Sequence, residues 1–145
     1  TDFEAGEEIP ISDRILLQTT PLNHPEGATG YRVNFNGKSI CYVTDTEHTP
    51  GTLDQNILKL IKGVDLFIYD STYTDEEFPN YVGWGHSTWQ EGVRLADAAG
   101  VKTLVVFHHD PSHHDNFMDE VSKKLHLMRP NGGGIVAQEG MTLSL

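Results

Sequence analysis

Basic residues and cysteine are scarce in this chain, and each shortage excludes a class of protein. Only 10 Lys and Arg residues stand against 21 Asp and Glu residues, which gives a formal net charge of −11. General nucleic-acid binding relies on Lys and Arg to neutralise phosphates, so we expect no sequence-independent binding of DNA or RNA. The single cysteine, Cys41, has no partner for an internal disulfide, which fits a reducing, cytoplasmic environment.

Long apolar runs are also missing. No run approaches the roughly 18 residues of a membrane span, and no charged-then-apolar leader opens the chain, so we predict neither a span nor export. The 145 residues are 37% hydrophobic and 21% charged, which is ordinary for a single α/β domain. We expect one structural unit over residues 1–145, in which the polar and acidic residues 1–13 are extended or frayed.

Apolar runs and turn signals predict alternating strands and helices. The expected strands cover residues 14–20, 30–35, 39–44, 64–69 and 102–107, with two short strands near the C-terminal end. Helices are expected after the capping-box patterns at 52–55 and 87–90, and a third helix after a cap at Ser112 or Asp115. Helices that alternate with buried strands indicate a layered α/β sheet, whose ligands bind at the carboxyl ends of the strands.

Histidine and aspartate side chains follow several of these strands directly. His24 follows the first strand, Asp45 follows the third, and His108 and His109 follow the apolar run 104–107. Imidazole and carboxylate groups bind zinc-like ions, and three ligands from separate strand ends suit a catalytic site better than a structural one. Taken alone, His24 could equally be a surface histidine and Asp45 a turn former. Together they predict one shared metal site.

The remaining histidines are less informative. His113, His114 and Asp115 are expected to begin the third helix, whereas His48 and His126 are expected on the surface.

Five short motifs, taken in order, carry a resemblance to a known family. They are Leu22-Asn23-His24-Pro25, Tyr42-Val43-Thr44-Asp45-Thr46, Asp65-Leu66-Phe67-Ile68-Tyr69-Asp70, Gly85-His86-Ser87-Thr88 and Val106-Phe107-His108-His109-Asp110. The chain resembles the metallo-β-lactamase superfamily over residues 14–145, in particular its ribonuclease Z and phosphodiesterase-like branch. The resemblance implies an α/β fold that forms half of an αββα sandwich, with a mixed β-sheet and helices packed on one face.

The resemblance also implies roles for individual residues. His24 corresponds to a ligand of a first metal ion, Asp45 to a carboxylate that bridges two ions, and His108 to the last ligand of the second ion. His109 is the alternative to His108. The implied cofactor is a divalent metal, with two zinc ions expected and manganese or iron as alternatives.

Two further residues carry implied catalytic roles. His86 corresponds to the histidine that contacts the scissile phosphate and stabilises developing negative charge. Asp70 corresponds to the acidic residue that orients this histidine. The implied activity is metal-dependent hydrolysis of a small phosphodiester or another ester.

One family motif is missing. The signature His-x-His-x-Asp-His, which supplies two ligands to each ion in the family, does not occur in this chain. We therefore expect a C-terminal half with one apolar sheet face uncovered, completed by the missing N-terminal half or a second polypeptide, with a homo-oligomer as an alternative. A non-catalytic metal-binding or regulatory module that pairs with another chain is the competing interpretation.

Overall fold

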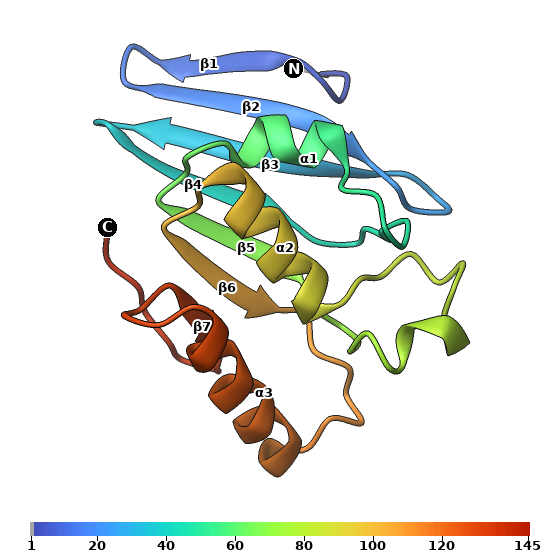
Figure 1. The fold of residues 1–145 in the computed structure, drawn as a ribbon. Coiled ribbons are helices and arrows are strands. Elements are labelled where there is room, and N and C mark those ends of the chain that lie inside the picture. Colours follow the sequence, from blue (N-terminus) through green and yellow to red (C-terminus); the bar gives the residue numbers. More distant parts are fainter. Residues whose placement is uncertain (1) are drawn as a thin grey trace.

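The computed structural model describes residues 2–145 and contains one seven-stranded sheet, with the strands in chain order from β1 to β7 (Figure 1). The strands are β1 (Glu8–Ser12), β2 (Ile15–Leu22), β3 (Ala28–Phe35), β4 (Lys38–Val43), β5 (Leu66–Asp70), β6 (Thr103–Phe107) and β7 (Gly134–Val136). Strands β1 to β4 pair antiparallel, and β4 to β7 pair parallel. The predicted mixed α/β architecture is confirmed.

Three α-helices lie against the sheet, α1 (Gln55–Ile61), α2 (Trp89–Ala99) and α3 (Asp115–Met128), with a short 3-10 turn η1 (Phe78–Asn80) before α2 (Figure 1). Their apolar residues and the sheet residues beneath them form one core, which includes Phe67, Val93, Leu104 and Leu125. Within residues 2–145, no helix combines the length and the hydropathy that crossing a membrane requires.

The side chains of β4 show how the sheet separates a covered face from an open one. Cys41 and Val43 are fully buried beneath the helices, whereas the alternate residues Ile40 and Tyr42 point to the opposite side. Exposed apolar side chains gather on that opposite side, which we call the outer face; its residues are Val33, Phe35, Ile40, Tyr42 and Phe107. Their exposed fractions lie between 37% and 46%. An uncovered apolar face was the expectation from the sequence.

Strand direction brings four predicted strand ends to one edge. Because β2 and β4 both pair antiparallel with β3, these two strands run in the same direction. Strands β5 and β6 continue parallel to β4. The carboxyl ends of β2, β4, β5 and β6 therefore share one edge of the sheet, where the candidate site lies.

The N-terminal residues were expected to be extended or frayed, and residues 8–12 are extended. They form β1, which pairs with β2 from Glu8 opposite Gln18 to Ser12 opposite Ile15. Near the other end, one strand, β7, is present instead of the two expected within the described residues.

The helix caps also differ from the predicted ones. Asp54 caps α1 by accepting from the Asn56 and Ile57 amides, so Gln55 does not complete a capping box with Thr52. Helix α2 is capped by Thr88, one residue after the predicted start. Helix α3 is capped by His114, rather than by Ser112 or Asp115, because the His114 ring accepts from the Phe117 amide. In each case the chain direction before the helix decides which side chain reaches the free amides.

Candidate metal centre

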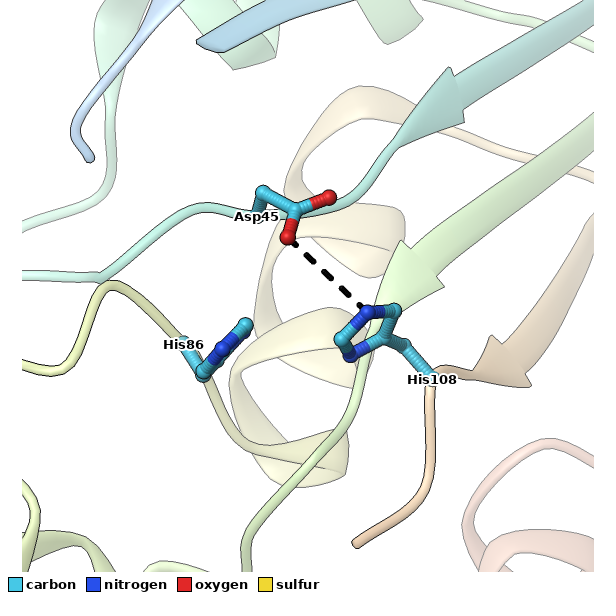
Figure 2. Close-up of side chains that lie close together, drawn as sticks. All are labelled: Asp45, His86 and His108. Atoms are coloured by element: carbon cyan, nitrogen blue, oxygen red, sulfur yellow. Dashed lines mark ion pairs between the residues drawn. The ribbon is translucent and has the colours of Figure 1, made fainter. Parts of the chain in front are cut away.

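Three side chains from different loops converge at the common edge. Asp45 follows β4, His108 follows β6, and His86 comes from the loop before α2 (Figure 2). Each offers one ligand atom, and the three atoms lie within 4.8 Å of one another. His108 Nε2 is 3.9 Å from Asp45 Oδ1, and the His86 and His108 rings are stacked with centroids 5.0 Å apart. All three side chains are partly exposed, so the cluster opens to solvent.

Two members of this cluster have an unusual backbone. Asp45 has φ 59° and His108 has φ 62°, in the left-handed region that non-glycine residues rarely adopt. Such strain costs on the order of 1–3 kcal/mol per residue, and it persists only where surrounding contacts hold it. In this protein the left-handed conformation turns both side chains toward the same space at the ends of their strands.

The buried carboxylate of Asp70 holds the loops of this cluster together. Asp70 is 0% exposed. Its Oδ2 accepts from the Asp45 amide at 2.9 Å and is 2.9 Å from His86 Nδ1, and its Oδ1 accepts from the Ser87 amide at 3.2 Å and from the Thr72 hydroxyl at 2.9 Å. One carboxylate thus connects the chain after β4, the chain after β5 and the His86 loop. The contact with Oδ2 also fixes the position of the His86 ring relative to Asp45.

The ionisation of His86 follows from this contact. A carboxylate only accepts hydrogen bonds, so His86 Nδ1 donates to Asp70, and the opposite nitrogen, Nε2, takes no part in this contact. The hydrogen bond to Asp70 raises the pKa of His86 above its ordinary value, against an opposing effect of burial. His86 therefore holds a proton more readily than a free imidazole.

His24 lies beside the cluster but outside it. Its ring is edge-on to His86 with centroids 6.3 Å apart, and its Nδ1 accepts from the Glu26 amide at 3.2 Å. The ring packs against Gly85, where a Cβ atom would approach His24 Nε2 to 2.8 Å. The structure thus brings together two of the three residues predicted as metal ligands, Asp45 and His108, and places His86 third.

His109 points away from the cluster. Its Nε2 lies 3.3 Å from the Ala137 carbonyl oxygen, and burial lowers its pKa. Of the adjacent pair, His108 is the one that faces Asp45.

Two residues that support the site carry no recognisable signal in the sequence. The prediction of a surface position for His48 is wrong: its ring is half-buried, stacks on Phe78 at 4.1 Å and lies 2.8 Å from Ser87 Oγ. Burial lowers the pKa of His48. The other is Glu47, whose Oε2 accepts from the Gly83 amide at 2.7 Å and the Gly85 amide at 3.1 Å and so holds the His86 loop. Isolated polar residues after Asp45 carry no pattern that would have identified either role.

Comparisons with known proteins agree with this fold. A family model described as a β-lactamase superfamily domain matches residues 1–109. Ribonuclease Z from Brevibacillus brevis is 35% identical over 114 residues, which cover 78% of this chain and 31% of that protein. Ribonuclease Z from Methanothermobacter thermautotrophicus is 29% identical over 103 residues, covering 71% of this chain and 29% of that protein. The chain therefore spans about a third of the length of these curated relatives.

Solved structures show the same architecture. The metallo-β-lactamase fold protein YhfI from Bacillus subtilis superposes with a TM-score of 0.77 at 16% identity, over 97% of this chain and 54% of that one. The short form of human tRNase Z superposes with a TM-score of 0.68 at 20% identity, over 94% of this chain and 46% of that one. At these identities the likeness establishes the fold alone.

Proposed function

The chain belongs to the β-lactamase superfamily, and on that premise we propose that it is part of a metal-dependent hydrolase that cleaves phosphodiesters. The observation that carries the proposal is the position of His86, which Asp70 holds at 2.9 Å within the cluster of Asp45 and His108. A histidine oriented by a buried carboxylate beside carboxylate and imidazole ligands is an arrangement suited to hydrolysis at an electrophilic phosphorus.

The donor atoms at this edge suit a divalent metal. Imidazole nitrogen and carboxylate oxygen are ligands of zinc, and of manganese and iron as alternatives. Asp45 and His108 would hold such a metal, and His24, whose ring lies beside the cluster, is the third proposed ligand. A bound divalent ion would supply Lewis-acid activation of water and of a phosphoryl oxygen.

His86 would act on the substrate rather than on the metal. Its raised pKa favours the imidazolium form, in which Nε2–H donates to a phosphoryl oxygen as negative charge develops there. Asp70 would keep the ring oriented and stabilise its positive charge, because it accepts from Nδ1 in every protonation state of His86.

The site needs further ligands, and the outer face needs a cover. Asp45, His108 and His24 are too few for two tightly held ions, and the chain spans about a third of its curated relatives. We propose that an N-terminal half, or a second polypeptide, packs on the outer face and brings the remaining ligands. Its exposed apolar side chains are what such a partner would bury.

The substrate class follows from two opposing observations. The relatives are named ribonuclease Z, which favours an RNA phosphodiester. The net charge of −11 disfavours binding of an extended phosphate backbone by this chain. The proposal is therefore a phosphodiesterase in which residues outside this chain bind any RNA body, while the residues here act on the scissile phosphate.

The test uses the full-length protein, with metal content measured by mass spectrometry and hydrolysis of bis-p-nitrophenyl phosphate as the activity. We expect Asp45→Ala to lose both metal and activity. His86→Ala should keep the metal and lose about 10²–10³-fold in rate, whereas the exposed His126→Ala serves as the unaffected control. Loss of metal in His86→Ala would make His86 a ligand instead. Full metal loading and turnover by residues 1–145 alone would refute the need for a partner, and no hydrolysis by the full-length protein would favour a non-catalytic module.

A further inference from the structure

The hydroxyl group of Thr72 lies between the buried Asp70 carboxylate and His108. Thr72 Oγ1 is 2.9 Å from Asp70 Oδ1, 2.8 Å from the His108 carbonyl oxygen and 3.1 Å from His108 Nδ1. Thr72 itself is buried, with 6% of its surface exposed, so water does not compete for these contacts. The hydroxyl therefore has three polar neighbours and must divide one proton and two lone pairs among them.

Counting protons decides the direction of the contact between Thr72 and the His108 ring. The Asp70 carboxylate and the His108 carbonyl oxygen can only accept, so the single hydroxyl proton of Thr72 goes to one of them. No proton is left for His108 Nδ1, and that contact must be donated by the ring. Neutral His108 consequently carries its proton on Nδ1, and its Nε2 presents a lone pair.

The lone pair of Nε2 faces a negatively charged oxygen. His108 Nε2 lies 3.9 Å from Asp45 Oδ1, along the dashed line in Figure 2. Two electron-rich atoms at this separation are stabilised by a shared cation between or beside them. The opposite tautomer would place a proton on Nε2 and close this position to a metal ion.

The same hydroxyl lies beside the backbone of His108. This residue has φ 62°, a left-handed conformation that a histidine adopts only under constraint. Thr72 Oγ1 lies within hydrogen-bonding distance of the carbonyl oxygen of this strained residue. Whether the hydroxyl proton goes to this carbonyl oxygen or to Asp70, the ring of His108 is the donor in its contact with Oγ1.

We propose that Thr72 is a positioning residue, which holds neutral His108 as the Nδ1–H tautomer and presents its Nε2, together with Asp45, to a divalent cation. The link to a cation rests on the proposed function, whereas the tautomer does not. Thr72 is connected through Asp70 to His86, so one buried network orients all three members of the cluster.

The tautomer can be read directly by two-bond ¹H–¹⁵N correlation of the histidine rings in the metal-free full-length protein, at a pH above the ordinary imidazole pKa. Thr72→Val removes the hydroxyl at nearly constant shape, and Thr72→Ser keeps it. We expect the Nδ1–H pattern for His108 in the wild type and in Thr72→Ser, and a gain of the Nε2–H pattern in Thr72→Val. Exposed His126 is the internal reference, unchanged in all three. An Nε2–H pattern in the wild type overturns the proposal even if Thr72→Val does not fold.

Zinc affinity, measured by calorimetric titration of the full-length protein, provides a second and separate readout. Thr72→Val should weaken zinc binding by about 10–100-fold, which is typical for loss of a group that orients a ligand, and Thr72→Ser should restore most of it. Equal affinities in the wild type and Thr72→Val would overturn the positioning role while the hydrolase proposal stands. If none of the proteins binds metal, the proposed function fails, and the His108 tautomer still decides the role of Thr72.

Discussion

Gly85 lies so close to the ring of His24 that no side chain fits between them. A Cβ atom at Gly85 would stand 2.3 Å from His24 Cδ2 and 2.9 Å from Pro25 Cδ. Gly85 also has φ 84°, and its amide donates to Glu47. The glycine one residue before His86 therefore sets the distance between the His24 loop and the His86 loop.

Replacing Gly85 with alanine should displace His24. Gly83 offers a matched control, because its φ of 91° would strain a substituted side chain similarly and its amide also donates to Glu47, yet a Cβ there meets nothing within 4 Å. We expect Gly83→Ala to lower the free energy of unfolding by about 1 kcal/mol through backbone strain alone. Gly85→Ala should lose a further 1–3 kcal/mol, roughly, from the collision. Urea denaturation measures the unfolding free energy of both variants. Equal losses would show that a Cβ atom at Gly85 does not collide with His24.

Asp70→Asn should disrupt the whole edge rather than one contact. The asparagine Nδ2 is a donor that replaces one carboxylate oxygen. It would face either the Asp45 amide and His86 Nδ1, which now donate to Oδ2, or the Ser87 amide and the Thr72 hydroxyl at Oδ1. We expect a loss of about 3 kcal/mol in the free energy of unfolding. In addition, the pKa of His86 should fall, because the hydrogen bond to Asp70 is the main cause of its rise.

Exposed Asp119→Asn is the control for this substitution and should leave both quantities unchanged. Histidine NMR titration gives the pKa, and denaturant unfolding gives the stability. A stable variant with an unchanged His86 pKa would remove Asp70 from its proposed role.

Two histidines should give the unfolding free energy opposite pH dependences. The pKa of His86 is raised in the folded protein, so its stabilising contribution is complete below the unfolded value of 6.5 and is lost as pH rises through the folded value. The pKa of His48 is lowered, so its contribution is present above the unfolded value of 6.5 and is lost as pH falls through the folded value.

The difference in unfolding free energy between wild type and His86→Gln should therefore shrink from pH 5 to pH 8, roughly, and that between wild type and His48→Gln should grow. Metal-free protein avoids competition from ligand binding. The same slope for both variants would contradict the assigned shifts.

Strand ends were predictable from the sequence because apolar runs and polar residues alternate sharply. The positions of Asp45 and His108 at a common edge follow from parallel strands, and the pairing of Asp70 with His86 followed from the family resemblance. These features depend on local pattern and on strand direction, which a sequence records.

Other features depend on contacts between distant segments. The hydroxyl of Thr72 and the ring of His108 are 36 residues apart, and Gly85 and His24 are 61 residues apart. Helix caps were misplaced by one or two residues because Thr52 and Asp54 are both acceptable caps, and the incoming chain direction selects between them. These contacts and caps are determined only when the distant segments come together in the sheet, so no local sequence pattern indicates them.

The outer face should make the isolated chain associate with itself. Val33 and Ile40 are cross-strand neighbours, each with 38% of its surface exposed, and Tyr42 and Phe107 extend the same apolar area with ring centroids 6.0 Å apart. Burial of such surface between two copies contributes roughly 25 cal/mol per Å², so the 145-residue chain should sediment as dimers or larger species at micromolar concentration. Ile40→Lys should shift it toward monomer, because a charge at the centre of the contact would lose its water.

Leu127→Lys is the matched control, because Leu127 on α3 is 81% exposed, far more than Ile40, yet belongs to no apolar face. Removing the same apolar bulk there should leave the sedimentation profile unchanged. In the full-length protein, Ile40→Lys should instead lower stability, since the proposed N-terminal half would cover that position. A monomeric wild-type chain, or equal effects of the two lysines, would show that the outer face is not a contact surface.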